Sequence, residues 1–500
     1  MSMISLSNLT FSYPGGYQPV FENCSVTFDT DWRLGLTGRN GRGKTTLLRL
    51  LLGSQKKEYG LCDYLGSIVS KTEFVYFPMP VKHPDYLAME VMQELCPGCE
   101  DWKIRRELEL LGIREDALWR SFETLSGGEK TKMQLAALFL REGAFALIDE
   151  PTNHLDVQGR ETVANYLKKQ SGFLLVSHDR DFLDQCVDHI ISLNRSDIEV
   201  RKGDFSGWYQ DYLTRTQSET QQNEKLKKEI RRLESAARRT AQWSDKVEAT
   251  KIGQGPCDRG AIGHKAAKMM KRSKAIEKRQ LDTAQQKKEL LKNVENVGGL
   301  KIQTEQHFSG KLAECYQLSI CYDNKEIFEP LTFSLEQGKK VCLQGRNGSG
   351  KTSLLRLIYG EKMEYSGVFR IASGVKISYV SQDTSGLYGN LQEYLEEQGA
   401  DITKCLSILR NLGFERSQFE IPTEQYSMGQ KKKVLIAKSL SQQAHLYLWD
   451  EPLNYIDIFS RIQIEQLLKQ SQAAMLFVEH DRRFCDNVAD SVIWVEPKQR

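Results

Sequence analysis

Two glycine-rich segments of the chain carry a lysine followed by a hydroxyl residue. They read GRNGRGKTT (38–46) and GRNGSGKTS (345–353), and both fit the pattern G-x-x-x-x-G-K-[ST]. Glycines let successive backbone N–H groups converge on phosphate oxygens, the lysine reaches the terminal phosphates, and the hydroxyl binds Mg²⁺. We therefore expect two ATP sites. Their expected nucleotide-binding residues are Gly38, Arg39, Asn40, Gly41, Arg42, Gly43, Lys44, Thr45 and Thr46, and Gly345, Arg346, Asn347, Gly348, Ser349, Gly350, Lys351, Thr352 and Ser353.

An acidic pair ends an apolar run in each half, in FALIDEP (145–151) and LYLWDEP (446–452). The aspartates would hold Mg²⁺ directly or through water, and the glutamates would polarise the attacking water. An isolated pair of this kind is usually a surface charge, but its ordered repetition beside the glycine-rich segments favours a catalytic role. The expected metal ligands are Thr45, Asp149, Thr352 and Asp450, and the expected catalytic carboxylates are Glu150 and Glu451.

The elements that must position these residues alternate between strand and helix. The glycine-rich segments follow the strand-like runs LGLT (34–37) and VCLQ (341–344), and each precedes a leucine-rich helical segment. A strand, a glycine loop and a helix in this order form the setting that a phosphate-binding loop requires. The sequence therefore predicts an α/β fold in each half.

Further segments repeat in the same order, so the chain is an internal duplication. Ser126 precedes Asp149 by 23 residues, and Ser427 precedes Asp450 by the same number. The matching pairs are LSGGE (125–129) with YSMGQ (426–430), TNHLD (152–156) with LNYID (453–457), and VSHD (176–179) with VEHD (478–481).

These motifs resemble the ATP-binding cassette superfamily over both halves. The resemblance implies two α/β cassettes with parallel core sheets that close head to tail on ATP. Each ATP then lies between the phosphate loop of one cassette and the LSGGQ-type segment of the other. The resemblance also implies histidines at the γ-phosphate, a tyrosine on each adenine and a glutamine that senses Mg²⁺ and the γ-phosphate. These residues would be His178, His480, Tyr13, Tyr322 and Gln382, with Ser126, Gly127, Gly128, Ser427 and Gly429 in the signature segments.

Two positions depart from the family pattern. Pro78-Met79 stands where the first cassette should have its glutamine, and Met428 replaces the first glycine of the second signature. Head-to-tail packing would place both changes at the site built on Lys44, which leads us to expect two unequal sites. The alternative is that backbone contacts and water compensate for both changes.

Composition limits the class of protein. Five hundred residues predict two or three domains, and no apolar run reaches the roughly 18 residues of a membrane-spanning helix. The N-terminus lacks the pattern of a secretory signal, and eleven scattered cysteines indicate reduced thiols, so we expect a cytoplasmic protein. The single C-x-x-C, Cys96 to Cys99, lacks a second pair, and we expect no metal beyond the Mg²⁺ that accompanies ATP.

The segment between the two cassettes is strongly basic. Residues 225–279 hold 17 Lys or Arg and 6 Asp or Glu, although the whole chain carries only +3. We predict helices at 208–250 and 262–296 joined by a glycine-rich loop at 251–263, with Leu226, Ile230, Leu233 and Ala237 in the seam. A basic arm of this kind is typical of polyanion binding, although a solvated helix face is the alternative. The expected RNA-binding residues are Lys265, Lys268, Lys271, Arg272 and Lys274.

We thus expect one cassette at 1–207, a helical-hairpin linker at 208–300 and a second cassette at 301–500. On the outgoing helix, Trp243 would either pack across the hairpin, which we favour, or stack on an unpaired base.

Two fused cassettes with a basic hairpin and no membrane segment resemble the ABC-F proteins. That resemblance implies an ATPase whose arm enters the tRNA exit site of the ribosome and meets large-subunit rRNA and P-site tRNA. The segments DRGAIGHKAAKMMKRSK and WDEPLNYID resemble the Lsa-type resistance branch, which protects ribosomes from lincosamides, streptogramin A compounds and pleuromutilins. The alternatives are a general translation factor, an ATPase pair that serves a membrane transporter, and a DNA-bound cassette ATPase.

Overall fold

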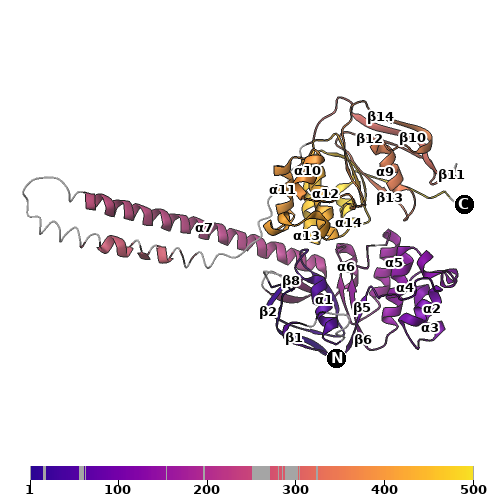
Figure 1. Cartoon of the computed structure of the whole chain (residues 1–500), viewed down its shortest axis with the longest axis horizontal. Coiled ribbons are helices and arrows are strands. Elements are labelled where there is room, and N and C mark those ends of the chain that lie inside the picture. The colour runs from indigo at the N-terminus through magenta and orange to yellow at the C-terminus, as the bar shows by residue number, and fades with distance from the viewer. Residues whose placement is uncertain are drawn as a thin grey trace, which may run out of the picture. The chain divides into compact units, whose positions relative to one another are not determined.

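The computed structural model describes most of the chain (Figure 1). For residues 240–249 it describes the backbone only. The chain divides into two compact units, one formed by Met1–Ser206 with Gly298–Arg500 and the other by Gly207–Val297. The described residues are 2–14, 19–55, 61, 63–153, 155–194, 197–249, 268, 271–276, 278–279, 281–283, 285, 287, 302, 304–322 and 325–498.

The described residues of the first cassette form two sheets. An antiparallel sheet has the strand order β2-β1-β4, and a core sheet has the order β5-β6-β7-β3-β8-β9, parallel except for β9. The central core strands are apolar on both faces because helices cover both, as in FLLV of β7. The strands are β1 (Met3–Phe11), β2 (Phe21–Asp29), β3 (Arg33–Thr37), β4 (Leu65–Val69), β5 (Glu73–Phe77), β6 (Ala144–Asp149), β7 (Phe173–Val176), β8 (His189–Leu193) and β9 (Ile198–Lys202).

Within the described residues of the first cassette, six α-helices accompany these sheets. Helix α4 begins at the signature segment, where the Ser126 side chain accepts a hydrogen bond from the Glu129 backbone N–H and thereby caps the helix. The helices are α1 (Lys44–Gly53), α2 (Ala88–Leu95), α3 (Asp101–Leu110), α4 (Gly127–Phe139), α5 (Val157–Leu167) and α6 (Arg180–Cys186).

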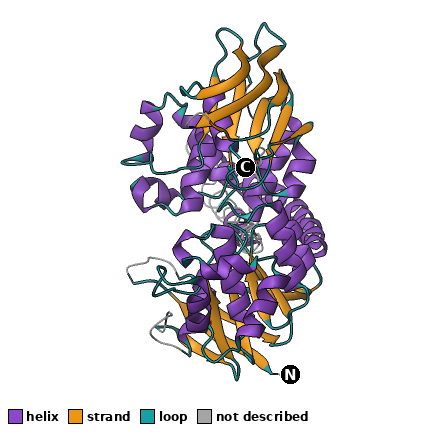
Figure 2. Cartoon of the chain, turned by 90° about the vertical axis from the view of Figure 1, so that its right-hand side faces the viewer, coloured by secondary structure: helices purple, strands orange, loops and turns teal. Residues whose placement is uncertain are grey.

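The second cassette repeats this plan. Its antiparallel strands are β10 (Lys311–Tyr322), β11 (Lys325–Glu326), β12 (Leu331–Glu336) and β14 (Glu364–Ile371). Its core sheet is wholly parallel, in the order β15 (Ile377–Val380), β16 (Leu446–Asp450), β17 (Ala474–Val478), β13 (Lys340–Gln344) and β18 (Ser491–Trp494). The helices are α9 (Lys351–Tyr359), α10 (Leu391–Glu397), α11 (Ile402–Asn411), α12 (Met428–Ser441), α13 (Ile458–Gln470) and α14 (Arg482–Val488). Figure 2 shows the strands of each cassette gathered in layers that helices cover, as the α/β prediction requires.

The described part of the linker unit includes the long helix α7 (Phe205–Ala249), which begins three residues before the predicted start. Within this unit Ile230 and Ala237 are buried, and Lys287 forms an ion pair with Glu229 although 58 residues separate them. The described helical turns of 271–287 run alongside α7 in Figure 1, which is the arrangement expected for a hairpin. The predicted loop at 251–263 lies outside the described residues. None of the described helices combines the length and apolar character needed to span a membrane.

Candidate nucleotide sites

The two glycine loops lie where the predicted setting places them. Each follows the carboxyl end of a central strand, β3 or β13, and leads into a helix that begins at Lys44 or Lys351. In the first loop, Gly41 and Gly43 have φ of 82° and 88°, conformations that side chains disfavour. Because parallel strands share one carboxyl edge, the aspartates that end β6 and β16 lie at the same edge as the loops.

Hydrogen bonds within the glycine loop, and between it and the end of β6, hold the Lys44 site together. The Lys44 ammonium donates to the carbonyls of Gly38, at 2.8 Å, and Arg39, at 3.3 Å. The Thr45 hydroxyl donates to the Asp149 carboxylate at 2.8 Å, which joins the glycine loop to the acidic pair. Tyr76, which lies outside the repeated motifs, donates to the same carboxylate oxygen at 3.1 Å.

The glutamate of each acidic pair has an unusual backbone conformation. Glu150 and Glu451 have φ of 53° and 45°, a left-handed region in which non-glycine residues are strained and which recurs at functional sites. Each carboxylate faces the predicted histidine of its own cassette. The distances from the histidine Nε2 to the carboxylate Oε1 are 3.3 Å for His178 and 3.5 Å for His480.

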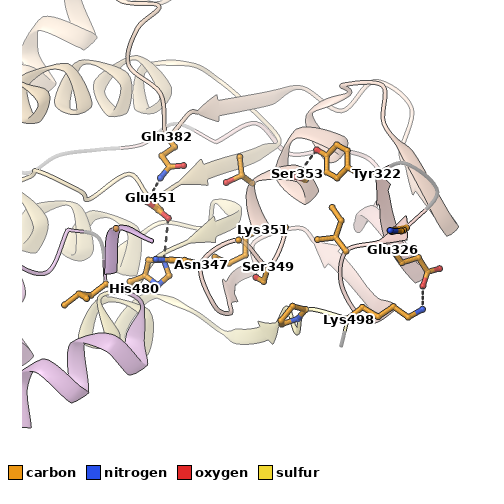
Figure 3. Close-up of a pocket in the computed structure, with 18 of the residues that line it drawn as sticks. Tyr322, Glu326, Asn347, Ser349, Lys351, Ser353, Gln382, Glu451, His480 and Lys498 are labelled. Carbon is orange, nitrogen blue, oxygen red and sulfur yellow. Dashed lines mark hydrogen bonds and ion pairs between the residues drawn. The ribbon is translucent and has the colours of Figure 1, made fainter. Parts of the chain in front are cut away.

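The Lys351 site opens into a cavity of about 1110 Å³ that both cassettes line. The second cassette contributes Lys351, Glu451 and His480, and Figure 3 shows these side chains together with Gln382. The first cassette contributes Gly127 of its signature segment and Asn153. This is the composite site that head-to-tail packing predicts.

The Lys44 site likewise receives residues from the second cassette. The Asn40 side chain donates to the Tyr455 carbonyl at 3.0 Å, and the Arg39 guanidinium lies 5.9 Å from the centre of the Phe459 ring. A Cβ on Gly429 would lie 2.7 Å from Asn40 Nδ2, so the second signature approaches the first glycine loop closely. Only glycine permits that approach without a clash.

Ion pairs away from the nucleotide loops also join the cassettes. Arg180 of α6 pairs with Glu465 of α13, and both side chains are buried. Arg483 of α14 lies 3.5 Å from Asp184 of α6. These contacts add polar links that hold the cassettes in register.

The two candidate catalytic carboxylates, Glu150 and Glu451, have different surroundings. The amides of Gln382 and Asn454 donate to Glu451 Oε2 at 2.8 and 2.7 Å. Both oxygens of Glu150 are buried, and no side-chain amide donates to them among the residues that the structure describes. Burial, with the charge of Asp149, raises the pKa of Glu150 to about 8. Burial also acts to raise the pKa of Glu451, but the hydrogen bond and charge of His480 outweigh it and hold that pKa below the usual value.

The two departures from the family pattern lie apart. Met79 is buried and lines a separate cavity of about 690 Å³ with Pro78 and Tyr76, while its backbone N–H donates to Gln134. Met428 is 45% exposed, and its sulfur accepts from the Thr384 hydroxyl at 3.7 Å. Met79 therefore lines a separate cavity, and it donates no hydrogen bond to Glu150.

The predicted adenine contacts are exposed aromatic rings beside the glycine loops. The hydroxyls of Tyr13 and Thr46 are 2.9 Å apart, and those of Tyr322 and Ser353 are 3.2 Å apart. Exposed rings anchored in this way offer a surface on which a base can stack.

The residues present fit a magnesium ion. Asp450 is fully buried, and its carboxylate oxygens have no hydrogen-bond partner within the described part of the chain. Burial raises its pKa to about 6, so a nearby cation would stabilise the ionised form. Carboxylate, hydroxyl and amide oxygens are ligands that Mg²⁺ prefers, and Thr352 and Gln382 supply the latter two. Bound with ATP, the ion would neutralise charge on the phosphates.

The structure places three further residues at these sites. The Tyr76 hydroxyl donates a hydrogen bond to Asp149, and the Asn454 amide donates one to Glu451. The Tyr455 carbonyl accepts a hydrogen bond from Asn40. Asparagine occupies the same place in the repeated segments TNHLD and LNYID, so the repeat itself contained a signal for Asn454. Nothing local distinguished Tyr76 or the Tyr455 carbonyl.

The predicted RNA-binding residues fall partly within the described residues. Lys268, Lys271, Arg272 and Lys274 are exposed, whereas Lys265 lies outside the described part of the chain. Ser273, between two of these cations, is buried, so the exposed charges share the outer side of a packed helix.

We expect Glu451→Gln to lower the steady-state ATPase rate far more than Glu150→Gln. Two side-chain amides hold Glu451, and its pKa lies below the usual value. Among the described residues no side-chain amide holds Glu150, and burial raises its pKa, which makes it less ready to accept a proton as a carboxylate. Replacing Glu451, the expected general base, should reduce the ATPase rate about 100-fold. Replacing Glu150 should reduce that rate less than about threefold. The measurement is phosphate release by each purified single variant at saturating ATP.

Equal effects, or a larger effect of Glu150→Gln, would show that the difference in surroundings does not govern turnover. Glu109→Gln changes an exposed carboxylate of the first cassette and serves as the matched control.

Comparisons with known proteins agree with this geometry. A family model described as ABC transporter matches residues 21–153 and 328–454. The chain is 29% identical to the ribosome protection protein VmlR of Bacillus subtilis (strain 168), covering 98% of this chain and 86% of that protein. It is 25% identical to the probable ATP-binding protein YheS of Escherichia coli (strain K12), covering 97% of this chain and 77% of that protein.

Among solved structures, the archaeal ribosome recycling factor aABCE1, in complex with ribosomal stalk protein aP1, has a similar fold. Its TM-score is 0.62 at 18% identity, covering 97% of this chain and 87% of that chain.

Proposed function

Because the chain belongs to the ATP-binding cassette family and is an ATPase with two cassettes, we propose that it acts on the ribosome and protects it from antibiotics. The observation that carries the proposal is the exposed basic face of the hairpin between two cassettes that share their ATP sites. The similarity to a ribosome protection protein over nearly the whole chain supports it. Ribosomes work in the cytoplasm, where we expect this protein.

ATP binding would bring the cassettes together and hydrolysis would let them part. Each composite site needs a glycine loop from one cassette and a signature segment from the other, so ATP stabilises the closed arrangement. Lys351 would bind the terminal phosphates, and Glu451 would accept the proton of the attacking water. His480, next to Glu451, would contact the γ-phosphate.

The arm would bind RNA through its charges. Lysine and arginine contacts to a phosphate backbone depend little on sequence and strongly on salt. We propose that the arm enters the tRNA exit site and meets large-subunit rRNA and P-site tRNA. The tip would then reshape nucleotides of the peptidyl-transferase centre, and a population shift at the drug site suffices without contact to the drug. The proposed drugs are lincosamides, streptogramin A compounds and pleuromutilins.

Changing Lys268, Lys271, Arg272 and Lys274 to Ala should weaken ribosome binding and reduce its salt dependence. Each lost phosphate contact lowers the slope of log affinity against log salt by roughly 0.7–0.9. Ribosome-free ATPase activity should stay unchanged, because these residues lie outside both cassettes. Ribosome co-sedimentation over a series of salt concentrations measures the slope.

A matched variant removes four exposed lysines from the cassettes, Lys71, Lys339, Lys362 and Lys469, and so makes the same change in net charge. It should keep the wild-type slope. If the arm variant also keeps that slope, its cations are a solvated helix face.

Two measurements test the function itself. ATP-dependent pelleting with ribosomes separates a ribosome-acting ATPase from an ATPase that serves a transporter. The transporter ATPase should not pellet with ribosomes. Deletion of the gene should lower the inhibitory concentration of the proposed drugs and leave growth without drug unchanged. A growth defect with unchanged drug susceptibility would identify a general translation factor instead.

A further inference from the structure

A buried lysine lies behind the glutamine of the Lys351 site. Lys432 belongs to helix α12, its exposed fraction is 1%, and its ammonium donates to the Ser381 carbonyl at 3.0 Å. Ser381 directly follows β15 and precedes Gln382. Taking a lysine out of water is costly, so a buried ammonium needs acceptors and opposite charges that compensate. The contact fixes the backbone from which Gln382 projects.

Gln382 depends on such support because it is exposed. Its amide donates to Glu451 Oε2 at 2.8 Å (Figure 3). An exposed amide can rotate into solvent, so its direction depends on how its backbone is held. The same turn is fastened to α12 at a second point, where the Thr384 hydroxyl donates to the Met428 sulfur at 3.7 Å. Helix α12 thus supports the turn on both sides of Gln382, and Lys432 supplies the support next to it.

Carboxylates compensate the charge of Lys432. Burial lowers the pKa of its ammonium, and acidic side chains act in the opposite direction. These side chains are Asp450, Glu479, Glu451 and Asp383. Asp450 and Glu479 are themselves buried. The ammonium therefore lies among the acidic residues around the Lys351 site.

The first cassette has other residues at the matching positions. Met79 stands in place of Gln382, and Thr131 stands in place of Lys432, five residues after the signature serine in both halves. A different contact holds the turn there, because the Gln134 side chain accepts from the Met79 N–H at 3.1 Å. The lysine and the glutamine thus occur together in one cassette and are replaced together in the other, as expected if the lysine serves the glutamine.

We propose that Lys432 is a positioning residue of the Lys351 site: it holds the Ser381 carbonyl and so keeps the Gln382 amide on Glu451. With Oε2 held by amide donors, the other oxygen of Glu451 faces His480 and stays available to the attacking water. A neutral side chain at position 432 would let Gln382 turn into solvent, and Glu451 would lose one of its two amide donors. The proposal rests on the ATPase activity alone and is independent of the ribosome.

The test uses full-length protein without ribosomes, carrying Glu150→Gln so that turnover comes from the Lys351 site. Lys432→Met keeps an apolar stem and removes the ammonium. It should lower kcat about tenfold and change KM for ATP less than about twofold, because positioning acts on the chemical step. Gln382→Met should cause a similar loss of kcat. In the Gln382→Met protein, Lys432→Met should lower kcat less than about twofold further, because both residues act through one hydrogen bond. Phosphate release over a range of ATP concentrations gives kcat and KM.

The matched control is Lys438→Met, the same change at a partly buried lysine of the same helix, and it should keep the parental kcat. Lys432→Arg retains a cationic donor and should keep more than about a third of that kcat. Lys432→Thr is a second variant without the ammonium, and the first cassette already accommodates threonine at this position. The proposal is overturned if Lys432→Met or Lys432→Thr keeps the parental kcat, if either loss multiplies with that of Gln382→Met, or if Lys432→Arg is as slow as Lys432→Met. A loss confined to KM would assign Lys432 to nucleotide binding and would also overturn it.

Discussion

Replacing both Glu150 and Glu451 with Gln should lower ATP hydrolysis more than about 100-fold while leaving ATP binding intact. Glutamine has the shape of glutamate, and its oxygen can still accept from Gln382 and Asn454. The substitutions do not alter the hydrogen bond from Thr45 to Asp149. The residues expected to bind phosphate and Mg²⁺ at the Lys44 site therefore stay in place. Chains that bind ATP without cleaving it should remain closed and accumulate on ribosomes. Co-sedimentation with ribosomes in the presence of ATP measures this accumulation.

The control carries Glu109→Gln and Glu397→Gln, two exposed positions, one in each cassette. It should hydrolyse ATP and sediment like the wild type. If the Glu150 and Glu451 double variant pellets no better than the wild type under ATP, hydrolysis does not govern release, and the assigned role of these carboxylates in the cycle is wrong.

Shortening residues 253–262 to a minimal turn should abolish drug protection while ribosome binding largely persists. These residues lie outside the described part of the chain, and their role is inferred from the glycine-rich sequence. The described part of the linker unit is held by its own contacts, including buried Ile230 and the ion pair of Glu229 with Lys287. The exposed cations at 268–274 therefore remain to bind RNA. Drug susceptibility in cells and ribosome co-sedimentation of the same variant are measured together.

A second variant keeps the length of 253–262 but replaces every residue with Gly or Ser. Loss of protection in the shortened chain alone would assign the effect to the reach of the tip, and loss in both would assign it to the side chains. Full protection by the shortened chain would refute the tip mechanism and leave occupancy of the exit site as the better account.

The sequence alone determined the parts of each site that lie close together along the chain. The glycine loops needed the positive φ that Gly41 and Gly43 adopt, and the apolar runs before them became the parallel strands β3 and β13. Local chemistry explains this success, because backbone freedom and strand burial are properties of a few consecutive residues. The order and the spacing of the repeated motifs in the two halves of the chain also predicted two cassettes.

Only the tertiary structure decided how the two sites differ. Asn40 and the Tyr455 carbonyl are 415 positions apart, and no local pattern pairs them. The departure at Met79 was visible in the sequence. Its burial beside Tyr76, and the absence of a side-chain amide on Glu150 among the described residues, depend on packing. The pKa of a carboxylate follows from what surrounds it in space, so identical Asp-Glu pairs acquired opposite shifts at their glutamates.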